Sequence, residues 1–383
     1  MHETVPRPYS LAQVALGIFV AGAALVLMGV QPILVGMFSD RLHLDLSQSG
    51  WVLATEQFGG AAGALFGFWV AIRVRWSLSI VLACGVAAAV NVATAFAHGL
   101  DMLLLARFAS GLASTLAYTV AISFLGQSTK PDRVFGALMV LQTAFFSIDA
   151  VLLPVMLERF GYIPTIASSA LWFVAALLAG FWMPTRTAQP GTTPSSAASG
   201  TAATRSWVGA AALAGAFLLQ MSIFAVWGFL EKIGRANGLA DTEIGYAIGL
   251  GVLGGIPGGL LPALIGERFG RLGMIAVATT LLVVSYVALG QALHLNGFLL
   301  WIFVLNVGWV LGLTYYMGLT VANDPDGRYT RLIAFSQILA AGVGPACSAL
   351  VTGDGRIAPI FIVAAIAAVA GWLAVAGANA WRR

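Results

Sequence analysis

The sequence has 383 residues, of which 60% are hydrophobic and only 9% are charged. A water-soluble globular domain carries about 25% charged residues. The composition therefore excludes such a domain and predicts a protein that crosses a membrane many times. The net charge of +4 gives no indication of nucleic-acid binding, and none is expected. Cys84 and Cys347 both lie in apolar stretches, which argues against a disulfide framework.

The first ten residues are polar and contain two prolines, and the apolar run after them is longer than the core of a signal peptide, so we expect no cleavable signal. Twelve apolar stretches follow, each close to the ~20 residues that a helix needs to cross a bilayer. In the first half they cover 11–37, 49–71, 76–97, 102–126, 134–157 and 162–183. In the second half they cover 207–230, 244–266, 272–293, 297–320, 331–352 and 357–380. The predicted fold is an all-α membrane protein.

A segment rich in Thr, Ser, Ala, Gly and Pro separates the two sets of six stretches. Such a composition is typical of a flexible linker. We therefore predict an N-terminal six-helix bundle at 1–184, a linker at 185–206 and a C-terminal six-helix bundle at 207–383.

The basic residues predict the orientation in the membrane. With the N-terminus inside, thirteen Lys and Arg residues fall on the cytoplasmic side and five fall outside. This distribution follows the positive-inside rule and predicts that both termini and the linker are cytoplasmic.

The two halves repeat one another in sequence. Arg75 and His98 are 23 residues apart, and so are Arg271 and His294. Arg133 and Gln142 are nine apart, as are Arg328 and Gln337, and both arginines follow a Pro-Asp pair. All these matches share an offset of 195 or 196 residues, which indicates a duplication. Six parallel-repeat stretches on each side of a linker predict two bundles that flank a central cavity.

Three charged residues lie well inside the predicted membrane stretches: Glu56, Arg107 and Asp149. A charge at such a depth costs about 2.5–3.5 kcal/mol on insertion scales unless it faces protein or water. Counted inward at about 1.5 Å per residue, the three lie within ~5 Å of the same depth, so Arg107 can pair with either acid. One arginine between two buried acids leaves a net negative charge, which favours proton uptake. A structural ion pair and a proton relay both remain open.

The loop between the eighth and ninth stretches carries the first family resemblance. Its residues 264–271 read Leu-Ile-Gly-Glu-Arg-Phe-Gly-Arg, similar to the Gly-x-x-x-Asp-Arg-x-Gly-Arg loop of the major facilitator superfamily. Glu267 takes the aspartate position, Arg268 and Arg271 match, and Ala263 replaces the leading glycine. The corresponding loop of the first half has basic residues but no acid. The resemblance covers essentially the whole chain and implies the twelve-helix fold of that family, with a gating role for Glu267, Arg268 and Arg271.

Arg107 and Gly111 resemble the Arg-x-x-x-Gly pattern in the fourth span that this family often links to proton coupling. In the resembled fold, the first, fourth, seventh and tenth spans line a central cavity. Each of these spans shows polar and aromatic residues, on the fourth and seventh as stripes at helical spacing. Such stripes are as typical of helix packing as of a solute site. The candidates for the cavity are Gln31, Ser114, Tyr118, Gln220, Phe224, Trp227, Asn306 and Trp309.

These observations predict a secondary active transporter of a small organic solute that works by alternating access and is coupled to protons. We expect it to act as a monomer in a bacterial-type inner membrane, with the solute, protons and lipid as its partners. No catalytic, ATP-binding or metal-binding motif is visible, so an enzyme, a cofactor and a metal site are not expected. The alternatives are a uniporter of the same fold and a non-transporting membrane sensor.

Overall fold

The computed structural model describes residues 9–127, 131–184, 202–324, 328–353 and 355–380, and every regular element in these residues is a helix. Most of the expected linker, 185–201, lies outside them. The described chain resumes at Ala202, which is already the first residue of a helix. Helical structure in the second half therefore begins five residues before the expected boundary at 207.

The described residues of the first half form nine helices. They are α1 (Leu11–Ala24), α2 (Val26–Gly29), α3 (Gln31–Leu42), α4 (Leu46–Arg73), α5 (Trp76–Thr94), α6 (Leu100–Leu125), α7 (Pro131–Phe160), α8 (Tyr162–Ser168) and α9 (Ala170–Gly180). The stretch expected as one span at 11–37 is thus three short helices that break at Leu25 and Val30. Pro32 lies in the first turn of α3, where its missing N–H group leaves no helical bond unmade.

In the second half, the residues that the structure describes form eight α-helices and two 3₁₀ turns. They are α10 (Ala202–Trp227), α11 (Leu230–Ala236), α12 (Asp241–Gly251), η1 (Val252–Gly254), α13 (Gly255–Ile265), α14 (Arg271–Leu289), α15 (Leu295–Ala322), η2 (Thr330–Leu332), α16 (Ile333–Val351) and α17 (Ala358–Ala380). The turn η1 falls within a cluster of glycines, residues with low helix propensity.

Nine helical segments of the described chain are long and apolar enough to cross a membrane, and two shorter ones, Leu11–Ala24 and Phe335–Val351, are also apolar. When the broken helices are joined, the elements group into twelve consecutive segments that match the twelve expected stretches. The protein is an all-α membrane protein, and the exact number of crossings stays a prediction of the sequence.

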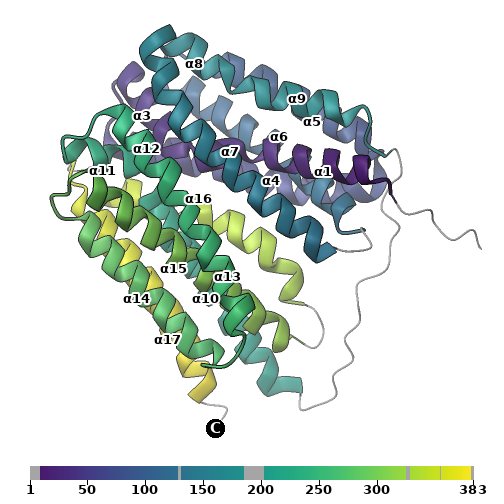
Figure 1. Cartoon of the computed structure of the whole chain (residues 1–383), viewed down its shortest axis with the longest axis vertical. Helices are drawn as coiled ribbons and strands as arrows, with labels where there is room; N and C mark the ends of the chain where they lie inside the picture. Colours follow the sequence, from purple (N-terminus) through teal and green to yellow (C-terminus); the bar gives the residue numbers. More distant parts are fainter. Residues whose placement is uncertain (1–8, 128–130, 185–201, 325–327, 354, 381–383) are drawn as a thin grey trace, which may run out of the picture.

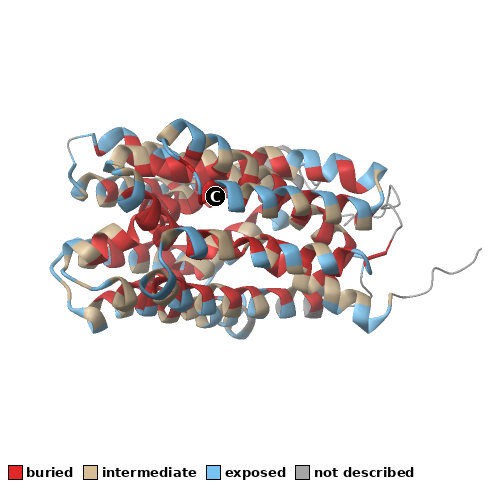
Figure 2. Ribbon diagram, turned by 90° about the horizontal axis from the view of Figure 1, so that it is seen from above, coloured by how far each residue is buried: buried red, intermediate tan, exposed pale blue. Residues whose placement is uncertain are grey.

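Helices α1–α9 gather into one group and α10–α17 into another (Figure 1). The two groups approach each other where α3, α11 and α12 lie, which we call the far end; α8 lies at the same end of the first group. They diverge toward the side where α1 begins and α17 ends. Large apolar side chains on the outer faces, such as Leu105 and Ile366, are exposed. Buried residues concentrate between the helices (Figure 2), the pattern expected where lipid surrounds the bundles.

Glycines set how closely the helices pack. A Cβ atom at Gly59 or Gly63 of α4 would lie about 2 Å from a backbone oxygen of α6, so these two helices touch backbone to backbone. Gly254 and Gly258 do the same against α15 in the second half. Each of these two contacts joins helices of the same bundle, the first bundle for α4 with α6 and the second bundle for the contact with α15. Gly245 instead packs α12 of the second half against Ala150 of α7, across the bundle boundary.

Candidate functional site

Arg107 and Glu56 form a buried ion pair between α6 and α4. Arg107 is 1% exposed and Glu56 is 8% exposed. Nε of Arg107 donates to Oε2 of Glu56 at 3.3 Å, and Nη2 donates to Oε1, so the guanidinium holds the carboxylate with two parallel bonds. This bidentate geometry is the strongest that an arginine and a carboxylate can form.

Further polar side chains complete this arrangement, which we call the polar cluster (Gln31, Glu56, Asn91, Arg107 and Ser110). Nη1 of Arg107 donates to Oδ1 of Asn91 at 2.8 Å, and Nδ2 of Asn91 donates to Ser110 Oγ at 2.9 Å. Nε2 of Gln31 donates to Glu56 Oε2 at 3.3 Å. All three donor nitrogens of the guanidinium are therefore occupied, and the cluster joins α3, α4, α5 and α6.

The packing of α4 on α6 explains why the two charges meet. A Cβ at Gly111 of α6 would lie 1.9 Å from the backbone oxygen of Glu56, so only glycine permits this approach. Gly111 lies four residues after Arg107 and therefore on the same face of α6. The close contact brings Arg107 onto the turn of α4 that carries Glu56.

Asp149 lies apart from this pair. Its two carboxylate oxygens each accept from Nε1 of Trp172 in α9 at 3.1 Å, and Asp149 is 5% exposed. The ring of Trp172 also packs on Phe145, with centroids 4.5 Å apart. The sequence predicted Glu56 and Asp149 as possible partners of Arg107, and in the structure only Glu56 pairs with it.

Five of the cavity candidates gather in the second bundle as an aromatic–amide cluster (Gln220, Phe224, Trp227, Asn306 and Trp309). Trp309 of α15 donates from Nε1 to Oε1 of Gln220 in α10 at 2.9 Å. Its ring lies edge-on to Phe224 at 5.7 Å and is tilted against Trp227 at 6.2 Å. Asn306 lies one turn before Trp309 on the same helix, and its Nδ2 donates to the carbonyl of Ile302.

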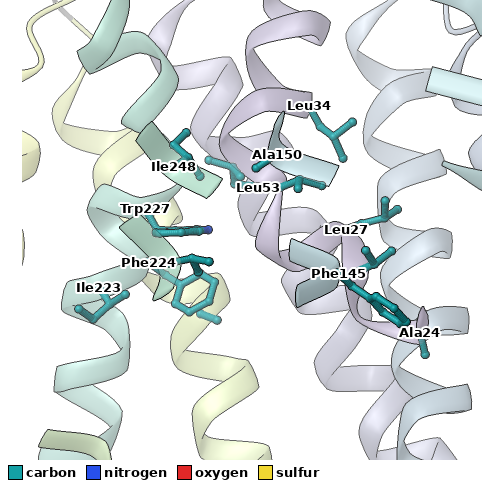
Figure 3. Close-up of a cluster of buried hydrophobic side chains, with 14 of the residues drawn as sticks. Ala24, Leu27, Leu34, Leu53, Phe145, Ala150, Ile223, Phe224, Trp227 and Ile248 are labelled. Carbon is teal, nitrogen blue, oxygen red and sulfur yellow. The ribbon is translucent and has the colours of Figure 1, made fainter. Parts of the chain in front are cut away.

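This cluster borders the first bundle. Nε1 of Trp227 donates to the carbonyl of Met28 in α2 at 3.4 Å, across the bundle boundary. Figure 3 shows Phe224 and Trp227 extending from one helix toward those that carry Leu53, Leu27 and Phe145. Trp309 is partly exposed, whereas Phe224 and Trp227 are buried.

The cavity candidates of the first bundle do not form a single cluster. Gln31 belongs to the polar cluster. Ser114 of α6 is 8% exposed, and its hydroxyl donates to the carbonyl of Gly111 in its own helix. Tyr118, one turn further along α6, is partly exposed. The structure thus joins Trp309 directly to Gln220, Phe224 and Trp227, with Asn306 one turn away on the same helix as Trp309. Ser114 and Tyr118 stay on the face of α6.

The candidate gating loop follows α13. Nη2 of Arg271 donates to Oε1 of Glu267 at 2.5 Å, and Glu267 and Arg268 are exposed. Gly266 and Gly270, which bracket this turn, have φ angles of +57° and +73°, a region that favours glycine. Tyr315 of α15 donates to the carbonyl of Gly266 at 2.6 Å and fixes the loop to the bundle.

Sequence reasoning missed a charge cluster at the far end. Arg235 of α11 forms ion pairs with Glu231 in its own helix, with Asp241 at the start of α12 and with Asp40 of α3. Glu231 is 5% exposed and packs against Gly36 of α3. Burial raises the pKa of Glu231 to about 7. Asp40 and Arg235 are 195 residues apart, which is the repeat offset and the signal that points to this contact.

Comparison with known proteins identifies the fold. The chain overlays a crystal structure of an auto-inhibited POT family peptide transporter with a TM-score of 0.74, at 16% identity, over 97% of both chains. It overlays the nucleoside transporter NupG with a TM-score of 0.73, at 12% identity, over 96% of this chain and 99% of that one. For an inward-facing, unoccupied bacterial homologue of the human lysosomal transporter Spinster, the TM-score is 0.63 at 14% identity, over 97% and 95% of the chains.

No curated protein matches this sequence. The sequence model of the Major Facilitator Superfamily matches residues 14–339, and this match covers most of the chain, including α4, α6, α10 and α15. Together with the arrangement of the helices, it shows that the chain belongs to the Major Facilitator Superfamily.

Proposed function

We propose that this protein is a proton-coupled secondary active transporter that moves a small organic solute by alternating access. It would act as a monomer in a bacterial-type inner membrane with both termini in the cytoplasm. The family supports transport as the general role. The proposed proton coupling rests on the residues argued below, and the proposed sidedness rests on the distribution of Lys and Arg along the sequence.

The positions of the contacts between the bundles support alternating access. Arg235 and Asp40 join α11 to α3, Trp227 joins α10 to α2, and Gly50 of α4 packs on Ala349 of α16. These contacts lie toward the far end, whereas the bundles diverge toward the other side (Figure 1). Rocking of one bundle against the other would break the far-end contacts and expose the aromatic–amide cluster to the opposite side.

The observation that carries the proton-coupling proposal is the buried pair of Glu56 and Arg107. Ionisable groups inside a membrane bundle are costly and usually serve a function. Glu56 can take up a proton only if Arg107 keeps another acceptor, and Asn91 Oδ1 at 2.8 Å from Nη1 is such an acceptor. The polar cluster can therefore exist in two protonation states without leaving the guanidinium entirely unpaired.

The hydrogen bond of Gln31 would link the protonation state of Glu56 to the first span. With Glu56 ionised, Nε2 of Gln31 donates to the carboxylate, while Oε1 of Gln31 is buried and has no partner in the described part of the chain. A protonated Glu56 is itself a donor, and a flip of the Gln31 amide would let Oε1 accept from it. Because Gln31 begins α3, which also carries Asp40, this exchange would link proton uptake to the far-end contact.

The test uses purified protein in liposomes that enclose the pH-sensitive dye pyranine. Solutes from a panel of neutral, anionic and cationic metabolites are added outside, and inward proton movement is followed by fluorescence. We expect at least one solute to move protons with the native protein and none to do so with Glu56→Gln or in protein-free liposomes. Gln31→Leu should retain solute binding but lose most of the proton movement.

Two results would favour one of the alternative functions instead. Solute exchange without proton movement would indicate the uniporter. Binding of a solute without any flux across the membrane would indicate the sensor.

A further inference from the structure

Away from the far end (α11 and the first turn of α12) and the helix ends, the second half of the chain presents no charge along its helices. Residues 206–230, 244–266, 272–322, 332–353 and 357–380 contain no Asp, Glu, Lys or Arg. The helices of the first half carry three charges away from their ends, at Glu56, Arg107 and Asp149. Within the described helices, a solute between the bundles and away from the far end could find a countercharge only among these three.

None of the three is free to hold an ionic solute. The guanidinium of Arg107 uses Nε and Nη2 on Glu56 and Nη1 on Asn91, and Glu56 in turn accepts from Arg107 and Gln31. Asp149 directs both oxygens to Trp172 of α9, within the first bundle. Its neighbours on α7, Ser147 and Ala150, touch the second bundle at Gly249 and Gly245.

The aromatic–amide cluster offers a different chemistry. It provides the partly exposed ring of Trp309, supported by the edges and faces of Phe224 and Trp227. The bond from Trp309 occupies Oε1 of Gln220 and thereby orients its amide. Nε2 of Gln220 and Oδ1 of Asn306 have no hydrogen-bond partner in the part of the chain that the structure describes. The cluster thus holds one oriented donor and one acceptor beside an indole ring.

From this arrangement we infer that the transported solute is uncharged and carries a flat apolar ring together with an amide or hydroxyl group. The ring would pack against Trp309, and the polar group would bond to Gln220 and Asn306. This inference rests on the proposed function, because it assigns the substrate class of the same transporter.

The physical reason is the cost of an unpaired charge. Transfer of an ion from water into a site without a countercharge is far more costly than transfer of an amide that finds its hydrogen bonds there. A ring gains from apolar burial and from offset or edge-on contact with indole. Neutral solutes therefore have an advantage that no charged analogue of the same ring can match.

Three compounds that share one ring and differ in charge test the inference: indole-3-acetamide (neutral), indole-3-acetate (anion) and tryptamine (cation). Each is added at neutral pH to the purified full-length protein in detergent. Cys347, which is partly exposed, is replaced by Ala in every protein compared. Unfolding is then followed with a thiol-reactive dye, because Cys84 is buried and becomes reactive only when the helices separate. A ligand that binds the folded state raises the unfolding temperature with concentration. We expect a rise with the amide and none with either ion.

Two variants locate the site. Gln220→Leu and Trp309→Phe should each weaken amide binding about tenfold, the equivalent of one lost hydrogen bond or ring contact. Trp301→Phe, on the same helix but outside the cluster, is the matched control and should bind as the native protein does. The unfolding temperature without ligand shows whether each variant is folded.

A charged member that binds as tightly as the amide would overturn the inference. So would the absence of any shift with the amide up to its solubility, or native affinity in both Gln220→Leu and Trp309→Phe. Failure of the proposed function looks different, because the amide would then still bind but would not cross the membrane of a proteoliposome.

Discussion

Arg235 of α11 donates from Nη1 to Oδ1 of Asp40 in α3 at 2.8 Å, and this bond ties the second bundle to the first at the far end. The two residues stand 195 positions apart, so they occupy equivalent places in the two repeats. Gly36 and Glu231, which pack together beside them, are separated by the same offset. Equivalent positions of a two-fold repeat can meet only close to the axis between the halves, where opposite charges can close the far end.

Asp40→Asn should shift the protein toward an open far end. The side chains of Arg235 and Asp40 are 35% and 53% exposed, so the bond is worth only about 0.2–1 kcal/mol, a few-fold in population. Spin labels at exposed positions on the two bundles, Ile163→Cys and Asn296→Cys with Cys84 and Cys347 replaced, report the separation by electron–electron resonance. We expect longer distances in Asp40→Asn. Asp101→Asn, an exposed acid in the first turn of α6, is the control, and identical distances in both variants would contradict the prediction.

Low pH should favour the closed far end. Burial against Gly36 raises the pKa of Glu231 from 4.5 to about 7. The positive charges of Arg235 and Lys232 lower this pKa, and the negative charges of Asp40 and Asp241 raise it further. Opening would hydrate the carboxyl and return its pKa toward the ordinary value. Between these two values the closed state binds more protons than the open state. It is therefore stabilised as the pH falls from about 7 and loses this advantage as the pH rises.

The same spin-label pair measures this effect between pH 5 and pH 8. Each unit of pKa difference corresponds to about 1.4 kcal/mol. Glu231→Gln should make the distances independent of pH over this range. A pH dependence that persists in Glu231→Gln would assign the effect to another group.

Arg107→Ala should abolish gradient-driven accumulation while still allowing insertion into the membrane. Loss of one partner of a buried pair costs about 3–5 kcal/mol if the remaining charge stays uncompensated, and Glu56 avoids part of this cost by holding a proton. Thermal unfolding and uptake under an imposed pH gradient are measured together. The double variant Glu56→Gln with Arg107→Gln should recover part of the lost stability without recovering accumulation. Full accumulation by Arg107→Ala would show that the ion pair stabilises the helix packing and has no role in coupling.

Asp149→Asn should retain the pH dependence of transport that Glu56→Gln loses. Asp149 contacts Trp172 and not Arg107, so it has no arginine to exchange when it gains a proton. Trp172→Phe removes the donor of a buried carboxylate and should lower the free energy of unfolding by about 1–3 kcal/mol. Proton-coupled uptake by both Asp149→Asn and Glu56→Gln, compared in the same liposomes, would refute the assignment of Glu56.

Gly111→Ala should disrupt the polar cluster although it adds a single methyl group. The new Cβ would lie 1.9 Å from the backbone oxygen of Glu56, so α4 and α6 must separate. Overpacking of this kind costs about 1–3 kcal/mol or more, and here it also pulls the ion pair apart. Gly99→Ala, just before α6, meets nothing within 4 Å and is the control. Equal unfolding temperatures in the two variants would contradict the close contact.

The amino-acid sequence by itself determined the fold class, the duplication and the family. These properties depend on signals that run along the chain: apolar stretches of membrane length, repeated offsets and the loop at Glu267–Arg271. It also isolated Glu56, Arg107 and Asp149 as the charges inside the helices, because charges in apolar stretches are visible without a structure.

The tertiary structure decided which of these residues meet. Depth along a helix axis follows from counting residues, but the direction in which a side chain points depends on how the helix is rotated and packed. The glycine contact at Gly111 brings Arg107 onto Glu56, while the side chain of Asp149 meets Trp172 of α9. Asp40 and Arg235 meet for the same reason, since the sequence shows that they are equivalent and only the packing of the two bundles places both beside the axis.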